Sequence, residues 1–312
     1  MVDQISPKLV FIGFLSNCDD SILQVKFENE FIVEKIDNST GIELLKLLSN
    51  SNDENEVIIR YINTGIFSKQ FDSFYAIKKV IEPGIMVDSN ASFIEILNFQ
   101  KDHFKLGEEW DRNVQEKLRL MRLFKEGNIL SPIQFIYIDL KKPIRVRSGF
   151  CFNSVDEEKF TLDASEINEL HEFINGNKIP FKDNSVNIAF QNFEFSYTIN
   201  SHGIALVSCT TVLECLLSLN NNYKSKEISK NMGALIGKDI ESSKEICDKV
   251  RKLYKKRSLF IHTGKSNINI DDLREARNLV RVAIKQFLIA NLTKNELIKA
   301  LKTKWFAEDC KQ

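Results

Sequence analysis

Apolar and polar residues alternate along several segments of the first 180 residues, as they do in half-buried strands. Segments rich in Phe, Ile and Val, often with this alternation, predict strands at Leu9–Leu15, Leu23–Lys35 and Val57–Ile62, and two more strands are expected at Gln134–Leu140 and Ile144–Phe152. Helical spacing predicts helices at Gly41–Leu48, Ser92–Phe104 and Glu108–Phe124, and a fourth on which Ile167, Leu170 and Ile174 share one face. Asp163 or Ser165 is the expected N-cap of that fourth helix. Strands and helices are therefore mixed in this part of the chain.

After Pro180 the strand pattern almost disappears. Helical spacing predicts helices at Asn184–Asn200, Gly203–Asn220, Ser225–Ile236, Ser242–His262, Asp271–Leu292 and Thr293–Lys302. Asp271 is the expected N-cap of its helix, and Gly237 and Gly264 are expected helix stops. We therefore expect an α+β protein, with a mixed α/β N-terminal domain at residues 1–180 and an all-α bundle at residues 181–312.

The composition favours folded domains. Of the 312 residues 43% are hydrophobic, Phe occurs 23 times, and Gly (12) and Pro (5) are scarce, which excludes a largely disordered or a fibrous chain. The 43 Lys and Arg balance the 43 Asp and Glu, but the two parts differ. Residues 181–312 hold 22 basic and 14 acidic residues, so the bundle carries +8 and residues 1–180 carry −8. This split suits an RNA-facing bundle and an N-terminal domain that senses, regulates, covers the bundle or positions the substrate.

Membrane and metal signals are weak in the sequence. The richest apolar segment, Ile204–Leu219, is interrupted by polar residues, and the N-terminus has no signal-peptide pattern. The six cysteines are scattered, without a CxxC pair or a His at metal-ligand spacing. We expect a soluble, cytoplasmic protein with reduced thiols, no metal or cofactor, and no membrane partner.

The densest basic segment of the chain is residues 249–257. Apolar residues such as Val250 and Leu253 can anchor this helix in a bundle core, while its charged side chains face outward. The candidate RNA-binding residues are Arg251, Lys252, Tyr254, Lys255 and Lys256. For Tyr254 packing is the simpler interpretation and base stacking the alternative. The plain alternative for the whole run is a solvated helix face.

Arg257 and His262 follow this run, and His262 lies in the last turn before Gly264. A His there can simply complement the helix dipole, or it can act in catalysis. Five steps of 100° place the two side chains about 140° apart, so Arg257 must curl back or a second subunit must complete a cleft. An imidazole and a guanidinium are sufficient to cleave RNA without a metal, because one moves a proton and the other stabilises charge on phosphorus.

The segment from Lys252 to Gly264 resembles the signature of HEPN domains, and of the Apea-like HEPN family in particular. That signature is a Tyr, an Arg followed by a polar residue, a His four to six positions later and a nearby Gly; here these are Tyr254, Arg257, Ser258, His262 and Gly264. The similarity extends over roughly residues 185–292, including an apolar helix with an embedded Glu at 212–217 and a helix with a Leu-Gly stop at 228–237. Residues 119–127 are similar to a segment often found upstream in this family. One departure is Thr263, because many relatives have His-Gly directly.

The resemblance implies an all-α HEPN bundle that acts as a metal-independent endoribonuclease. Arg257 would stabilise the phosphate in the transition state, His262 would act as general base or acid on the ribose hydroxyl, and Ser258 would orient substrate or His262. Both subunits of a homodimer would line one cleft, and the product would carry a 2′,3′-cyclic phosphate. Such proteins often act in antiviral defence and abortive infection, as toxins that cleave tRNA or other RNA.

Glu214 is a candidate supporting residue. A carboxylate in an otherwise apolar helix is costly to bury alone, so Glu214 either reaches solvent at the helix margin or pairs with an arginine, for which Arg257 is the candidate. Two other functions stay open: a non-catalytic HEPN module for RNA binding or partner recruitment, and a toxin or antitoxin module that partners a nucleotidyltransferase. The N-terminal part lacks the paired-carboxylate Gly-Ser signature of a nucleotidyltransferase itself.

Overall fold

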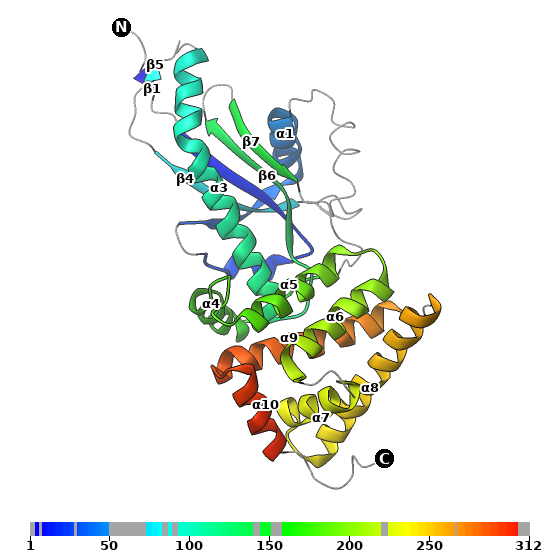
Figure 1. Cartoon of the computed structure of the whole chain (residues 1–312). Coiled ribbons are helices and arrows are strands. Elements are labelled where there is room, and N and C mark those ends of the chain that lie inside the picture. Colours follow the sequence, from blue (N-terminus) through cyan, green and yellow to red (C-terminus); the bar gives the residue numbers. More distant parts are fainter. Residues whose placement is uncertain are drawn as a thin grey trace. The chain divides into compact units, whose positions relative to one another are not determined.

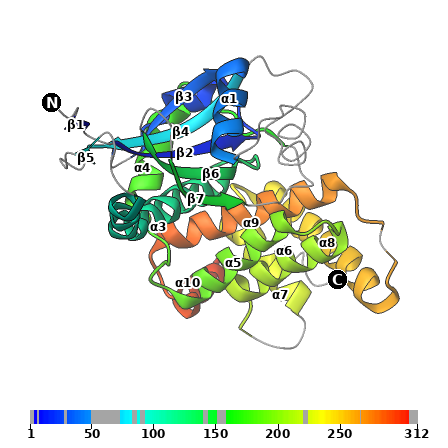
Figure 2. The same ribbon diagram turned by 90° about the horizontal axis from the view of Figure 1, so that it is seen from above.

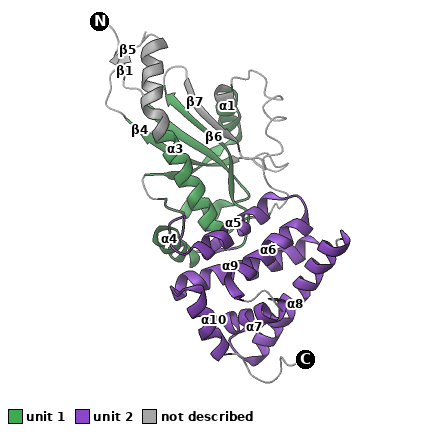
Figure 3. Ribbon diagram, viewed as in Figure 1, with its two compact units in different colours: residues 1–122, 126–177 green, residues 123–125, 178–312 purple. Residues whose placement is uncertain are grey.

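The computed structural model describes residues 4–5, 8–27, 30–49, 73–82, 87–88, 93–139, 144–150, 158–219, 224–265 and 267–304. The chain forms two compact units, residues 1–122 with 126–177 and residues 123–125 with 178–312 (Figure 3). The fold is α+β: the described strands lie in the first unit, and the second is helical. Among the described helices, none is both long and apolar enough to cross a membrane.

An antiparallel sheet forms the centre of the first unit. Its strand order is β3 (Ile32–Asp37), β4 (Ser73–Ile81), β2 (Lys8–Ser16), β6 (Leu130–Asp139) and β7 (Ile144–Phe150). A separate small pair joins β1 (Gln4–Ile5) to β5 (Val87–Asp88). Helices α1 (Asn38–Ser49) and α3 (Phe93–Phe124) cover opposite faces of the large sheet (Figure 1, Figure 2). Both faces of β2 are therefore buried, and its sequence is a continuous apolar run.

The two faces of the sheet have separate cores. On the α1 side, β-strand residues such as Ile12, Phe74 and Phe135 pack with Leu45 of the helix. On the α3 side, Trp110 forms edge-to-face contacts with Phe11 and Phe31, with ring centroids 6.4 Å and 6.5 Å apart. The ammonium of Lys79 lies 5.4 Å from the centroids of the Phe31 and Trp110 rings, a cation–π arrangement.

The prediction of two separate helices at Ser92–Phe104 and Glu108–Phe124 is wrong, because α3 is one helix of 32 residues that runs through Gly107. A Cβ atom at Gly107 would lie 2.2 Å from Cδ1 of Ile136 on β6. The glycine therefore lets the helix approach the sheet closely rather than ending it.

The strand expected at Leu23–Lys35 is also partly wrong. Its first part contains a short 3₁₀ helix, η1 (Asp20–Gln24), whose N-cap Asp19 accepts hydrogen bonds from the Ser21 N–H and hydroxyl. The pairing with β4 begins only at Ile32. Strand β4 was not predicted, because Lys78 and Lys79 interrupt its apolar pattern. The strand expected at 57–62 lies outside the described residues. The strands expected at 9–15, 134–140 and 144–152 correspond to β2, β6 and β7.

Helix α4 (Glu166–Gly176) buries Ile167, Leu170 and Ile174, as its periodicity predicts. Ser165 is its N-cap residue, but the side chain makes no capping hydrogen bond. His171 of this helix accepts a hydrogen bond at Nε2 from the Lys26 N–H, 2.9 Å away. That bond needs an unprotonated Nε2, so the neutral imidazole links α4 to the segment after η1.

The second unit consists of α5 (Asn184–Thr198), α6 (His202–Leu217), α7 (Lys224–Ile236), α8 (Ile240–Thr263), α9 (Ile270–Ala290) and α10 (Lys294–Thr303). The predicted helices agree with these bounds to within three residues. Gly264 ends α8 in the left-handed conformation at φ 66°, as expected of a glycine stop.

Asp271 is not the N-cap of α9, which is a correction to the sequence analysis. The N-cap is Asn269, and its side chain accepts from the Asp272 N–H while the Asp272 carboxylate accepts from the Asn269 N–H. This reciprocal capping box starts the helix at Ile270 and places Asp271 inside the first turn.

We predict that His171 makes the stability of the protein depend on pH. Burial, assisted by the nearby Lys26 charge, lowers the pKa of His171 below its ordinary value. Unfolding then takes up a proton near neutrality, so the free energy of unfolding should fall as the pH decreases through about 6.5 towards the lower pKa of the folded state. Urea unfolding at pH 8.0, 7.0, 6.0 and 5.5 measures this fall.

His171→Gln is the control for this prediction. The Gln carbonyl can accept the same N–H bond and does not titrate, so the variant should show a smaller loss between pH 7 and 5.5. An equal loss in both proteins would contradict the assignment to His171.

Candidate functional site

Helices α7 and α8 approach each other unusually closely through small residues. A Cβ at Gly233 would lie 2.7 Å from Sγ of Cys247, and one at Gly237 would lie 2.0 Å from Oγ of Ser243. The Ser243 hydroxyl donates to the Gly233 carbonyl at 3.1 Å. The two glycines thus let the first half of α8 lie directly against α7.

The second half of α8 is held against α6. The Tyr254 hydroxyl donates to the Thr210 carbonyl at 3.2 Å, and burial raises the pKa of that hydroxyl. Near the end of α8, the Phe260 ring occupies the space beside Gly203, where a Cβ would lie 2.5 Å from the ring. These contacts fix the rotation of α8, and with it the direction in which its last two turns face.

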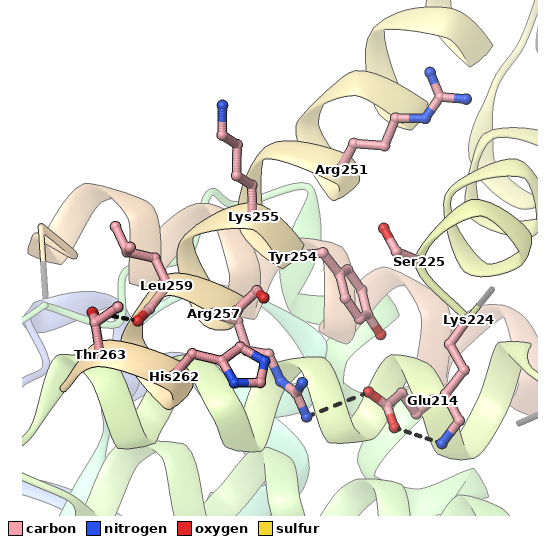
Figure 4. A pocket seen from close by; sticks show the side chains of 11 residues that line it. Glu214, Lys224, Ser225, Arg251, Tyr254, Lys255, Arg257, Leu259, His262 and Thr263 are labelled. Carbon is pink, nitrogen blue, oxygen red and sulfur yellow. Dashed lines mark hydrogen bonds and ion pairs between the residues drawn. The ribbon is translucent and has the colours of Figure 1, made fainter. Parts of the chain in front are cut away.

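A pocket of about 770 Å³ lies where α6, α7 and α8 meet (Figure 4). The larger part of its lining comes from α8, and the rest from Glu214 of α6 and the first residues of α7. The residues that line it are Glu214, Lys224, Ser225, Arg251, Tyr254, Lys255, Arg257, Ser258, Leu259, His262 and Thr263. All of them lie in the second unit.

Glu214 lies between two cations of the pocket. Its Oε1 is 3.8 Å from a terminal nitrogen of Arg257, and its Oε2 is 3.2 Å from Nζ of Lys224. Figure 4 shows the guanidinium and the ammonium directed at the carboxylate from two sides. The Glu214 side chain is 21% exposed, so the two cations offset the cost of placing this carboxylate in an apolar helix.

Arg257 and His262 line the same pocket although their positions on the helix are about 140° apart. The length of the Arg257 side chain accounts for this, because its guanidinium extends toward Glu214. Within the described part of the chain, the buried Nε of Arg257 has no hydrogen-bond partner. His262 is exposed in the last turn of α8, and Ser258 lies one turn before it on the same face. Thr263 extends α8 by one residue, with its hydroxyl donating to the Leu259 carbonyl at 2.7 Å.

The structure divides the five candidate RNA-binding residues. Arg251 and Lys255 line the pocket, and their charged ends extend away from Glu214 (Figure 4). Tyr254 also lines it, but its hydroxyl is used in packing. Lys256 forms an ion pair with Asp272 at the start of α9, and Lys252 is exposed outside the pocket lining.

Lys256 contributes to the bundle itself. Burial opposes the charged form of Asp272, but the hydrogen bonds from Lys256 and from the Asn269 backbone lower its pKa overall. The Lys256 ammonium thus connects α8 to the capping box that starts α9. The expectation that Lys256 faces RNA is therefore not supported by its position.

Lys224 and Ser225 were missed in the sequence. Lys224 is a single basic residue at the start of a helix, and nothing in the local pattern relates it to a carboxylate ten residues earlier on another helix. The signal that was available is Glu214 itself, whose charge inside an apolar helix requires cationic neighbours.

Among the residues that the structure describes, no group of three or more His, Cys, Asp and Glu side chains could hold a metal ion. No protein-family model matches the chain, and comparisons with curated proteins and with solved structures found no significant match.

We predict that Tyr254 acts mainly in packing. Tyr254→Phe should reduce the free energy of unfolding by about 1 kcal/mol, because it removes one buried hydrogen bond. The matched control is Leu259→Ala, an exposed residue of the pocket lining, which should change it by less than about 0.5 kcal/mol. Urea denaturation measures both. If Tyr254→Phe were as stable as the wild type, the hydroxyl would not hold α8 on α6.

Proposed function

We propose that the protein is a metal-independent endoribonuclease of the HEPN type, whose second unit cleaves RNA and leaves a 2′,3′-cyclic phosphate. The observation that carries the proposal is that Arg257 and His262 line one pocket. The resemblance around residues 252–264 gave these two residues their roles, and their shared pocket supports that pairing.

The charge of the pocket favours a polyanionic substrate. Arg251, Lys255, Arg257 and Lys224 contribute four positive charges to the lining, against the single carboxylate of Glu214. Counting His262 as neutral, the net charge is thus +3, which attracts an anion. A volume of about 770 Å³ is large enough for a nucleotide-sized group.

The proposed reaction needs one proton acceptor and one fixed cation. Neutral His262 accepts the proton of the ribose 2′-hydroxyl, and the resulting oxygen attacks the adjacent phosphorus. The bond from phosphorus to the 5′-oxygen breaks, and that oxygen takes a proton from water or from His262 of the partner subunit. Arg257 stabilises the negative charge that builds on the phosphoryl oxygens, since its guanidinium presents paired donors to them. The products are a 2′,3′-cyclic phosphate and a 5′-hydroxyl.

The biological setting and the assembly rest on the resemblance alone. We propose a homodimer formed through the helical unit, and a role as a toxin or anti-phage effector that cleaves tRNA or another RNA. The acidic first unit remains the candidate for regulation by a partner, on the basis of its charge of −8 over residues 1–180. Of these proposals only the homodimer enters the reaction, since a partner subunit would supply the second His262; the roles of Arg257 and of the first His262 need one chain.

We predict that Arg257→Ala and His262→Ala each reduce RNA cleavage by at least about 100-fold, because each removes a group that acts in the transition state. The assay incubates the full-length protein with end-labelled RNA in the presence of EDTA and identifies the product ends. Cleavage by the wild type should persist in EDTA and give cyclic phosphate ends.

Lys265→Ala is the matched control, since Lys265 is an exposed cation beyond the end of α8 and outside the pocket lining. It should retain wild-type cleavage. Cleavage retained in both active-site variants would contradict the proposal. A wild-type protein that binds the labelled RNA and leaves it intact would favour the non-catalytic RNA-binding module instead.

A further inference from the structure

The wall of the pocket opposite α8 is formed by the start of α7. Lys224 and Ser225 are the α7 residues in the lining, and Lys224 is the cationic one. Its ammonium lies 3.2 Å from Oε2 of Glu214, while the Arg257 guanidinium lies 3.8 Å from Oε1 of the same carboxylate. Two cations from two different helices therefore share one acidic residue.

Glu214 does not neutralise both cations. One carboxylate between two positive side chains leaves a net charge of +1 at the inner end of the pocket. The Lys224 side chain remains 37% exposed, and its ammonium has three donors, of which the bond to Glu214 uses one. Lys224 can therefore donate to an anion that enters the pocket without leaving Glu214.

The position of Glu214 determines where such an anion can lie. The space between the Arg257 and Lys224 charges is occupied by the carboxylate, which repels a phosphate. We therefore expect a phosphate held by Arg257 and one held by Lys224 to occupy separate positions, each beside its own cation. A substrate that uses both cations needs two phosphates in one chain.

We infer that Lys224 is a substrate-binding residue that holds a second backbone phosphate next to the scissile one, and that Glu214 is a positioning residue that holds both cations at the pocket. This inference rests on the proposed function. It assigns to the endonuclease a second phosphate subsite, on α7, that the Arg and His signature does not include. A ligand with one phosphate can occupy only one of the two phosphate positions.

The test compares Lys224→Met with Lys226→Met in the full-length protein. Met keeps most of the aliphatic stem and removes the charge, and Lys226 is an exposed lysine of the same helix outside the pocket lining. With a labelled oligoribonucleotide, Lys224→Met should raise KM about tenfold, because one hydrogen bond to a charged group contributes about that factor to affinity. The value of kcat should change less than about twofold. Lys226→Met should leave both at wild-type values.

Salt dependence gives an independent measurement of the same contact. The slope of log KM against log salt concentration should be smaller by about 0.7 in Lys224→Met, since one phosphate contact fewer releases fewer counterions from a single strand. Lys224→Arg keeps the charge and should restore both KM and the slope. Equal urea midpoints for Lys224→Met and the wild type show that the variant is folded; if it is destabilised, Lys224→Gln replaces it.

The outcomes separate this inference from the proposed function. If Arg257→Ala and His262→Ala cleave RNA like the wild type, the proposed function fails. If those variants are inactive but Lys224→Met has a wild-type KM and salt slope, only the assignment of Lys224 is overturned. A lower kcat with an unchanged KM would also overturn it, because Lys224 would then act through Glu214 and Arg257 and not on the substrate.

Discussion

The candidate site depends on how closely α8 lies against α6 and α7. At Gly203, Gly233 and Gly237 a single added carbon would collide with α8 or with its side chains. A residue larger than glycine at any of these positions would require α8 to move away from α6 or α7. The pocket lies where these three helices meet, so the close approach at these glycines positions the helices that carry its lining residues.

Close packing leaves α8 with two chemically different sides. Val250, Leu253 and Tyr254 are buried, and they hold the helix in the bundle. The cations between them cannot all have the same role, because each meets different neighbours. Lys256 pairs with the Asp272 carboxylate of α9, and Arg251 pairs with Asp248 of its own helix at 3.5 Å. Arg251 and Lys255 also line the pocket, where their charged ends extend away from Glu214. The helix rotation thus divides a run of basic residues into a cation that connects two helices and cations that face the pocket.

Most helices of the second unit were predicted correctly because the residues that start and end them lie close together in the sequence. The wrong or missing predictions fall where the deciding contact is made with a residue far away in the sequence. The end of α8 follows from Gly264, an expected stop whose left-handed backbone closes the helix, and its start lies two residues before the predicted one because the Asp239 side chain accepts from the Ser242 N–H. Strand β4 was missed because its pairing with β2 and β3 is made over long separations, and because its two lysines hide the apolar pattern. Two helices were predicted where α3 is one, and the contact that accommodates Gly107 inside it is with Ile136 on a distant strand. Lys224 was missed for the same reason, because its partner Glu214 lies on another helix.

The spacing of Arg257 and His262 in the sequence does not by itself bring the two side chains together; contacts with other helices do. Four intervening residues place the side chains on different faces of one helix, so the pair alone defines no site. Glu214 changes this, because it draws the long Arg257 side chain to the α6 side of the pocket that His262 also lines. A shorter cation such as Lys would carry the same charge but lacks the guanidinium fork that presents paired donors to phosphate oxygens. The placement of Arg257 and His262 in one pocket therefore depends on a third residue, on a different helix.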